Sequence, residues 1–236
     1  MNNKVAFCIN NLKVGGAEKL LIDLINNWPG RFEIYLILLQ EKDNLSDLLD
    51  ASRNIKKITL WNTSSTCYQI KEIRRLFVTN KIDFCFSHLE RSNKICLMAS
   101  LMTKTRVFPV IHNINIYEES PLCVKYTASI IYQILSRVVV AISEPVRNYC
   151  IDTLKINGKK IIQINNGIDF KRIEQYERDL SFDDKVSFAV LGRMEYVKGY
   201  DILLQALGSD KLRNLNWQLK MIGDGSELQK LRTLAG

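Results

Sequence analysis

Two basic residues, Arg193 and Lys198, follow an apolar stretch over 186–191 whose residue types indicate a buried parallel strand. A helix with a leucine-rich face is expected directly after them, over 200–207. Open parallel sheets bind ligands at the carboxyl ends of their strands, and helix amino termini attract anions. A guanidinium and an ammonium at such a place suit a diphosphate, because Arg offers a bidentate fork and Lys a point charge. The alternative is a solvated loop that carries two basic residues.

A second candidate anion site lies near the start of the chain, at the paired glycines Gly15 and Gly16. They fall between an apolar segment expected as a strand, 5–9, and an amphipathic helix expected over 17–28. Bare backbone N–H groups at such a turn can approach a phosphate closely. A plain tight turn is the alternative. The loop lacks the GxGxxG pattern of dinucleotide-binding domains, which argues against an oxidoreductase that uses a nicotinamide or a flavin.

The two histidines, His88 and His112, each follow a short apolar segment that is expected as a strand, 84–87 and 106–111. Arg91 comes soon after His88, ahead of a helix expected over 94–102. A histidine satisfied within the core is the default interpretation for either one alone. Their shared position at strand ends makes both of them, together with Arg91, candidate site residues.

Several motifs follow one another in a recognisable order along the chain. They are Gly15-Gly16-Ala17-Glu18, then Val140-Ala141-Ile142-Ser143 with Asn166-Gly167-Ile168-Asp169 after it, then Gly192-Arg193 with Lys198-Gly199, and finally Gly223-Asp224-Gly225. In this order they resemble the retaining GT-B glycosyltransferases of the family called GT4, over nearly the whole chain.

The resemblance implies an α/β, GT-B-like architecture with Rossmann-like domains. We expect a complete acceptor-side domain over 1–169, a charged linker over 170–184, and the first half of a donor-nucleotide-binding domain over 185–236. In the family the donor domain continues to a Glu-rich motif that is missing here. We therefore expect that this stretch alone transfers sugar poorly unless another chain completes it. The alternative is a non-catalytic nucleotide- or acceptor-binding remnant, or a partner subunit of a split enzyme.

The resemblance also implies roles for individual residues. The donor would be a nucleotide-sugar, and the acceptor a hydroxyl of a carbohydrate or a lipid-linked saccharide, with retention at the anomeric carbon. Arg193 and Lys198, with the backbone at Gly15 and Gly16, would bind the donor diphosphate, and His112 would be the catalytic residue beside the donor sugar. The acceptor- or sugar-side candidates are His88, Arg91 and Asn166. Neither a metal nor another cofactor is expected, because cations and helix termini would replace a metal on the diphosphate.

Composition is compatible with these expectations. The 236 residues are 47% hydrophobic and 25% charged, with a formal net charge of +8. That balance favours an anionic partner such as a nucleotide or a phosphate-bearing lipid, and the lack of long runs of like charge argues against nucleic acid. With no signal peptide or membrane span evident, we expect a cytoplasmic protein that admits peripheral contact with the inner membrane face. The basic face of a helix expected over 68–80 could contact anionic lipid at the membrane, or it could simply be solvated.

The six cysteines contain no CxxC pair, and most of them lie inside apolar stretches. We expect them to be buried, reduced thiols. With only two histidines and no clustered ligands, the sequence does not indicate a zinc site.

Overall fold

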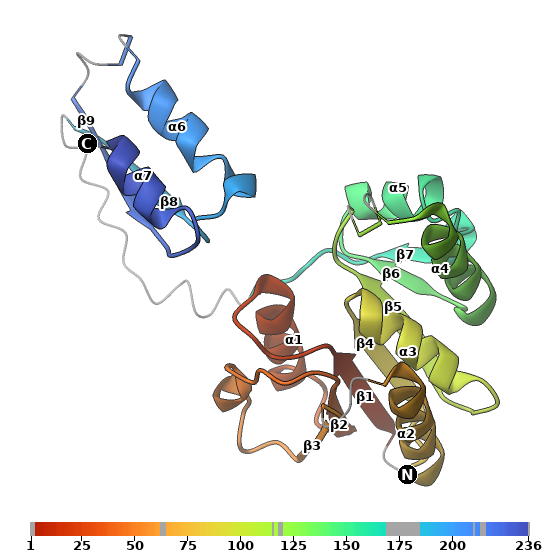
Figure 1. Cartoon of the computed structure of the whole chain (residues 1–236). Helices are drawn as coiled ribbons and strands as arrows, with labels where there is room; N and C mark the ends of the chain where they lie inside the picture. The colour runs from red at the N-terminus through yellow and green to blue at the C-terminus, as the bar shows by residue number, and fades with distance from the viewer. Residues whose placement is uncertain are drawn as a thin grey trace. The chain divides into compact units, whose positions relative to one another are not determined.

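The computed structural model describes residues 3–61, 65–114, 116–117, 120–168, 185–209, 211–212 and 216–235 (Figure 1). The chain divides into two compact units, residues 1–170 and 171–236. The linker expected over 170–184 lies outside the described residues.

The first unit is built on a seven-stranded sheet in which every neighbouring pair of strands is parallel. The strand order is β3-β2-β1-β4-β5-β6-β7. The bounds are β1 Lys4–Ile9, β2 Glu33–Leu38, β3 Ile55–Thr59, β4 Phe84–His88, β5 Arg106–Ile111, β6 Val139–Ala141 and β7 Ile161–Gln163. The order reverses between β1 and β4, so the loops after these two strands diverge and open a crevice at the carboxyl edge. The predicted α/β fold class is confirmed.

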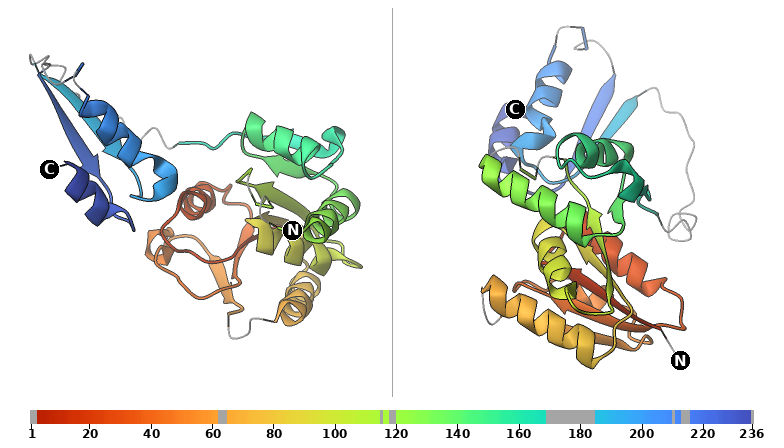
Figure 2. Two further views of the ribbon diagram at one scale, coloured as in Figure 1. Left: turned by 45° about the horizontal axis from the view of Figure 1, so that its top comes forward. Right: turned by 90° about the vertical axis from the view of Figure 1, so that its right-hand side faces the viewer.

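Among the described residues, five α-helices cover the two faces of this sheet: α1 Gly16–Asn26, α2 Thr66–Thr79, α3 Glu90–Ser100, α4 Leu122–Leu135 and α5 Glu144–Asp152. Alternate residues of β1 point to opposite faces. Phe7 packs in a core with Leu21 and Ile25 of α1, whereas Cys8 packs in a second core with residues of the other four helices. Figure 2 (right) accordingly shows α1 on one side of the sheet, with α2 and α4 on the other. None of the helices among the described residues combines the length and the hydropathy that crossing a bilayer requires.

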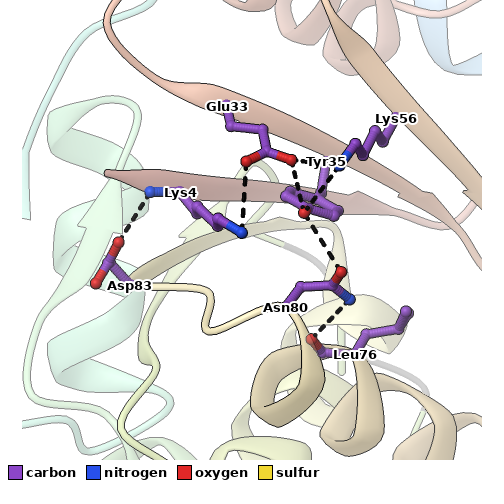
Figure 3. Close-up of polar contacts among 7 residues, drawn as sticks. All are labelled: Lys4, Glu33, Tyr35, Lys56, Leu76, Asn80 and Asp83. Carbon is purple, nitrogen blue, oxygen red and sulfur yellow. Dashed lines mark hydrogen bonds and ion pairs between the residues drawn. The ribbon is translucent and has the colours of Figure 1, made fainter. Parts of the chain in front are cut away.

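A polar network closes the amino edge of the sheet, away from the crevice (Figure 3). The Glu33 carboxylate on β2 contacts the ammonium groups of Lys56 on β3 and, at 3.4 Å, of Lys4 on β1. The Tyr35 hydroxyl donates to it at 2.9 Å. Hydrogen bonds from Lys56 and Tyr35 lower the pKa of Glu33 to about 2, so the carboxylate is ionised at neutral pH. The network therefore ties three strands together where no ligand is expected.

Two boundaries differ from the sequence prediction near the crevice. His88 is the last residue of β4 rather than the residue after it, and α3 begins at Glu90 rather than near residue 94. Leu89 accounts for the early start, since its backbone adopts φ 70° and ψ 155° and turns the chain directly into the helix. Arg91 therefore lies in the first turn of α3.

The cysteines form no disulfide, and Cys8, Cys85, Cys96 and Cys150 are buried as predicted. Cys67 and Cys123 are exposed, which corrects the prediction for these two. Each sits in the first turn of an amphipathic helix, α2 or α4, on a side that faces solvent.

The second unit pairs β8, Val186–Leu191, in parallel with β9, Trp217–Ile222. A 3-10 turn, η4 Tyr196–Lys198, precedes α6, Tyr200–Leu207, and α7 spans Leu228–Ala235. Met194, Tyr200 and Leu231 form its small core. The prediction that β8 is buried is wrong, since all but one of its residues are exposed. A two-stranded sheet with two short helices has too little apolar material to cover both faces of a strand.

Lys81 offers a test of how α2 ends. It has φ 52° just past the helix, where its N–H and that of Ile82 donate to Val78 and Phe77 in a Schellman motif. Because this left-handed conformation is costly for a residue with a Cβ, Lys81→Gly should raise the free energy of unfolding by about 0.5–1 kcal/mol. Urea denaturation followed by circular dichroism measures it. The matched control is Lys71→Gly inside α2, which should lower stability by about 1 kcal/mol; equal losses in both variants would contradict the assignment.

Candidate functional site

The crevice at the carboxyl edge of the first unit is a cleft of about 550 Å³. Its size falls in the range of small-molecule sites. The loop after β1, the start of α3 and the end of β5 supply its walls. The polar residues that line it are Asn10, Glu90, Asn93, His112 and Asn113. The cleft thus lies where the reversal of strand order predicts a ligand site.

His88 and His112 meet at this edge, with His88 Nδ1 and His112 Nε2 3.0 Å apart. The contact follows from the topology, because β4 and β5 are hydrogen-bonded neighbours, β4 ends at His88, and His112 directly follows the last residue of β5. His88 is buried and His112 is half-buried. The structure therefore joins two residues that the sequence identified separately.

Burial determines the charge state of this pair. Desolvation, with a smaller contribution from His112, lowers the pKa of His88 to about 3, and desolvation lowers that of His112 to about 4. Both imidazoles are neutral at pH 7. Because His112 Nε2 is engaged by His88, the nitrogen of His112 left for another partner is Nδ1. A neutral imidazole held this way can exchange hydrogen bonds with hydroxyl groups without adding charge.

Glu90 and Asn93 are cleft residues that sequence reasoning missed. They lie three positions apart in α3 and therefore share one face of that helix. Burial raises the pKa of Glu90, whose carboxylate accepts a hydrogen bond of 2.7 Å from the Tyr132 hydroxyl and lies 3.3 Å from the Lys94 ammonium. Asn93 donates to the Val110 carbonyl at 3.0 Å. The one available signal was the i, i+3 spacing of polar side chains at a helix start.

Asn166 lines a second, more apolar cavity of about 330 Å³. Leu24 of α1, Trp28 just after that helix, Phe86 of β4 and His88 also line it. His88 thus contributes to this cavity while it supports His112 at the first one. Asn166 itself is exposed, in the segment that follows β7.

Arg91 lies away from both cavities. Its Nη2 donates to Gln69 Oε1 on α2 at 3.0 Å, and Gln69 Nε2 in turn donates to the Leu39 and Leu60 carbonyls at 2.7 and 3.0 Å. These bonds join the start of α3 to α2 and to the ends of β2 and β3. The acceptor-side role expected of Arg91 stays a prediction.

Gly15 and Gly16 form the start of α1, with Gly15 as its N-cap. They have different surroundings. A methyl group on Gly15 would collide with the carboxylate of Glu18, which is buried and bends back toward the cap in the manner of a capping-box residue. A methyl group on Gly16 would meet nothing within 4 Å. The open approach to this helix terminus is therefore at Gly16, and Glu18 brings a negative charge to its other side.

Arg193 and Lys198 lie in the second unit, on the exposed connection from β8 to α6. Arg193 Nη1 is 2.8 Å from Glu195 Oε1, whereas Lys198 has no ion-pair partner among the described residues. Two backbone bonds hold this connection against the turn after β9: Met194 N donates to the Asp224 carbonyl at 2.8 Å, and Glu227 N to the Met194 carbonyl at 2.9 Å. The approach is so close that a Cβ on Gly225 would overlap the Met194 backbone. The Gly223-Asp224-Gly225 turn thus positions the loop that carries Arg193.

The histidine pair makes a testable contribution to stability. In the folded protein the pKa values of both histidines lie below that of a free imidazole, which is about 6.5. As the pH falls through 6.5, the unfolded chain therefore binds more protons than the folded chain does. The stability that the protein gains from keeping both histidines neutral is therefore complete above pH 6.5 and is lost progressively as the pH falls toward 4. Urea midpoints between about pH 7 and 5 measure it, because few carboxyl groups titrate there. His112→Asn should flatten the dependence; an unchanged slope would contradict the low pKa of His112.

Known proteins of similar sequence and fold indicate the family of this chain. The family model described as Glycosyltransferase Family 4 matches residues 14–172. A curated relative, the GalNAc-alpha-(1->4)-GalNAc-alpha-(1->3)-diNAcBac-PP-undecaprenol alpha-1,4-N-acetyl-D-galactosaminyltransferase of Campylobacter jejuni, is 23% identical over 97% of this chain and 63% of its own length.

Similar solved structures include Anabaena HepE in complex with UDP, with a TM-score of 0.78 at 18% identity over 98% of this chain and 65% of that one. The same protein with UDP-glucose gives a TM-score of 0.74. A glycosyltransferase from Rickettsia africae gives 0.72 at 17% identity, over 99% of this chain and 65% of that one. The chain thus spans slightly less than two thirds of these proteins and shares their fold. Since the family model covers well over half of its residues, the chain belongs to glycosyltransferase family 4.

Proposed function

We propose that this chain takes part in the transfer of a sugar from a nucleotide-sugar to a hydroxyl of a lipid-linked saccharide, with retention of configuration at the anomeric carbon. The observation that carries the proposal is the polar cleft around His112 at the reversal of strand order, in a chain of this family. UDP and UDP-glucose bound to the Anabaena protein support a nucleotide-sugar donor. The name of the Campylobacter relative supports a lipid-linked acceptor.

The donor side of the proposal concerns the charge of the leaving group. As the bond from the anomeric carbon to the phosphate oxygen breaks, the nucleoside diphosphate gains negative charge. Arg193 and Lys198 would stabilise that charge as cations, and the first backbone N–H groups of α1 at Gly16 would stabilise it as dipoles. For Arg193 to do so, its guanidinium must exchange Glu195 for the diphosphate. With these groups on the diphosphate, the proposal includes no metal ion.

The acceptor side concerns the cleft of the first unit. The acceptor oxygen would bond to the anomeric carbon on the face that the diphosphate leaves, and its proton would pass to the departing phosphate. His112, neutral at pH 7, would position the donor sugar through its Nδ1 rather than attack it. Glu90 and Asn93, on the same wall, are the groups that we propose for hydroxyl recognition. The expectation that this stretch alone transfers sugar poorly stays a prediction.

The affinity of the chain for UDP tests the donor site whether or not the chain catalyses sugar transfer. Replacing Arg193 removes charge-assisted hydrogen bonds of about 1.5–3 kcal/mol, so Arg193→Gln should weaken UDP binding roughly ten- to a hundredfold in titration calorimetry. Arg232→Gln is the matched control, since Arg232 is an exposed arginine on α7 of the same unit. It should bind UDP like the unchanged chain. Equal affinity in all three proteins, or binding of NAD in place of UDP, would contradict the proposal.

Gly16→Ala separates ligand binding from folding. The new methyl group meets no atom of the chain and replaces a helical glycine, so the free energy of unfolding should rise by about 0.5–1 kcal/mol. The same methyl group would occupy the space through which a phosphate approaches α1, so affinity for UDP should fall. Calorimetry and urea denaturation measure the two effects. The control Gly15→Ala should instead lose stability, because it displaces buried Glu18. Unchanged UDP affinity in the Gly16→Ala protein would show that the amino terminus of α1 does not contact the donor.

A further inference from the structure

An unpartnered apolar stripe runs along the outer face of α4. Leu122, Tyr126, Ile130 and Ile134 recur every fourth residue and are between 53% and 73% exposed. The opposite face of the helix, with Ala128 and Tyr132, is buried in the core. Over 14 residues the stripe extends about 20 Å. Solitary exposed apolar residues are common, but a continuous row along a whole helix indicates a surface that another body covers.

The stripe continues onto the turn between α3 and β5. Met102 in this turn is fully exposed, and Leu101 is 43% exposed. The turn and the end of α4 enclose a cleft of about 710 Å³ that Leu101, Met102 and Ile134 line together. Helices α3 and α4 lie next to each other on the side of the sheet away from α1 (Figure 2, right). The apolar surface therefore belongs to one continuous part of the first unit.

Basic side chains border the same cleft. Lys104, Arg106 and Arg137 line it, and all three are exposed. Within the described part of the chain, none of the three forms an ion pair. The stretches 98–106 and 120–137, which supply the turn and α4, contain four basic residues and no acidic one. The surface thus combines apolar side chains with an excess of positive charge that the protein itself leaves unneutralised.

We propose that this surface docks the first unit on an anionic phospholipid membrane, with the α4 stripe and Met102 in the acyl boundary and the three cations at the lipid phosphates. Apolar residues with an interfacial tyrosine, bordered by unpaired Lys and Arg, match the chemistry of a leaflet rich in acidic lipids. A protein partner would need acidic groups against the same cations. The docking surface rests on the proposed function and deepens it, since a lipid-linked acceptor lies in such a membrane.

The basic face of α2, which the sequence also offered for lipid contact, is less suited to it. Arg74 donates to the Met98 and Ala99 carbonyls at the end of α3, at 2.9 and 3.3 Å, and Arg75 lies 2.6 Å from Glu72. Lys71, the third basic residue of that face, forms neither such a hydrogen bond nor an ion pair among the described residues. Two of the three charges are therefore already engaged within the protein, whereas those around the α4 cleft are not.

Flotation of the full chain with vesicles tests the proposal without any donor or acceptor, so its outcome is separate from that of the UDP experiments. We expect binding to vesicles that contain phosphatidylglycerol, little binding to pure phosphatidylcholine, and release by salt. Each cation near an anionic surface contributes about 1 kcal/mol, so Arg106→Gln with Arg137→Gln should weaken partitioning about thirtyfold. The matched control, Lys71→Gln with Lys159→Gln, removes the same charge elsewhere and should bind like the unchanged chain.

A second pair of variants tests the contribution of the apolar α4 stripe to membrane binding. Ile130→Ser with Ile134→Ser should release the chain from phosphatidylglycerol vesicles, whereas Leu48→Ser with Val78→Ser, at exposed apolar positions outside the stripe, should not. Circular dichroism verifies that each variant is folded. Lack of binding by the unchanged chain, or equal losses in test and control pairs, would overturn the proposal. A third outcome would also overturn it: the unchanged chain binds no vesicles and sediments as a dimer, and the Ile130→Ser with Ile134→Ser variant sediments as a monomer. The stripe would then be an interface between two copies of the chain.

Discussion

The common direction of the seven strands in the first unit determines where its candidate site residues lie. Because every pair is parallel, the strands all end at one edge, and the loops after β1, β4 and β5 gather there. The reversal of strand order between β1 and β4 opens the cleft at that edge. The polar network around Glu33 fastens the opposite edge (Figure 3). One edge is thus fixed by ion pairs, and the other is left free for a ligand.

The two units differ in the electrostatic character of their candidate residues. In the first unit the histidine pair is held neutral by burial, and Glu90 is screened by Tyr132 and Lys94. In the second unit Arg193 and Lys198 are exposed, charged groups. A neutral, hydrogen-bonding surface suits sugar hydroxyls, while exposed cations suit phosphates. This division agrees with the proposal that one unit recognises saccharide and the other recognises nucleotide diphosphate.

The strands and most helices of both units could be predicted from hydrophobic periodicity, and the strand-end position of His88 and His112 was visible in the sequence. Their contact was not, because the adjacency of β4 and β5 is a property of the sheet and not of either segment. The early start of α3 was missed because Leu89 adopts a positive φ that its residue type does not indicate. The exposure of β8 was missed for a different reason: apolar composition predicts a strand, but burial depends on what packs against it. The bending of Glu18 toward Gly15 could have been read from its position three residues after the cap.

We propose that the diphosphate of a nucleotide-sugar is bound by Arg193 and Lys198 together with the amino terminus of α1. A crystal structure of this chain with UDP tests that claim most directly. We expect the Arg193 guanidinium to have left Glu195 for a phosphate oxygen, with the Lys198 ammonium and the backbone N–H of Gly16 also within hydrogen-bond distance of the diphosphate. UDP bound with its phosphates elsewhere, while Arg193 remains on Glu195 and no ligand atom approaches Gly16, would contradict it.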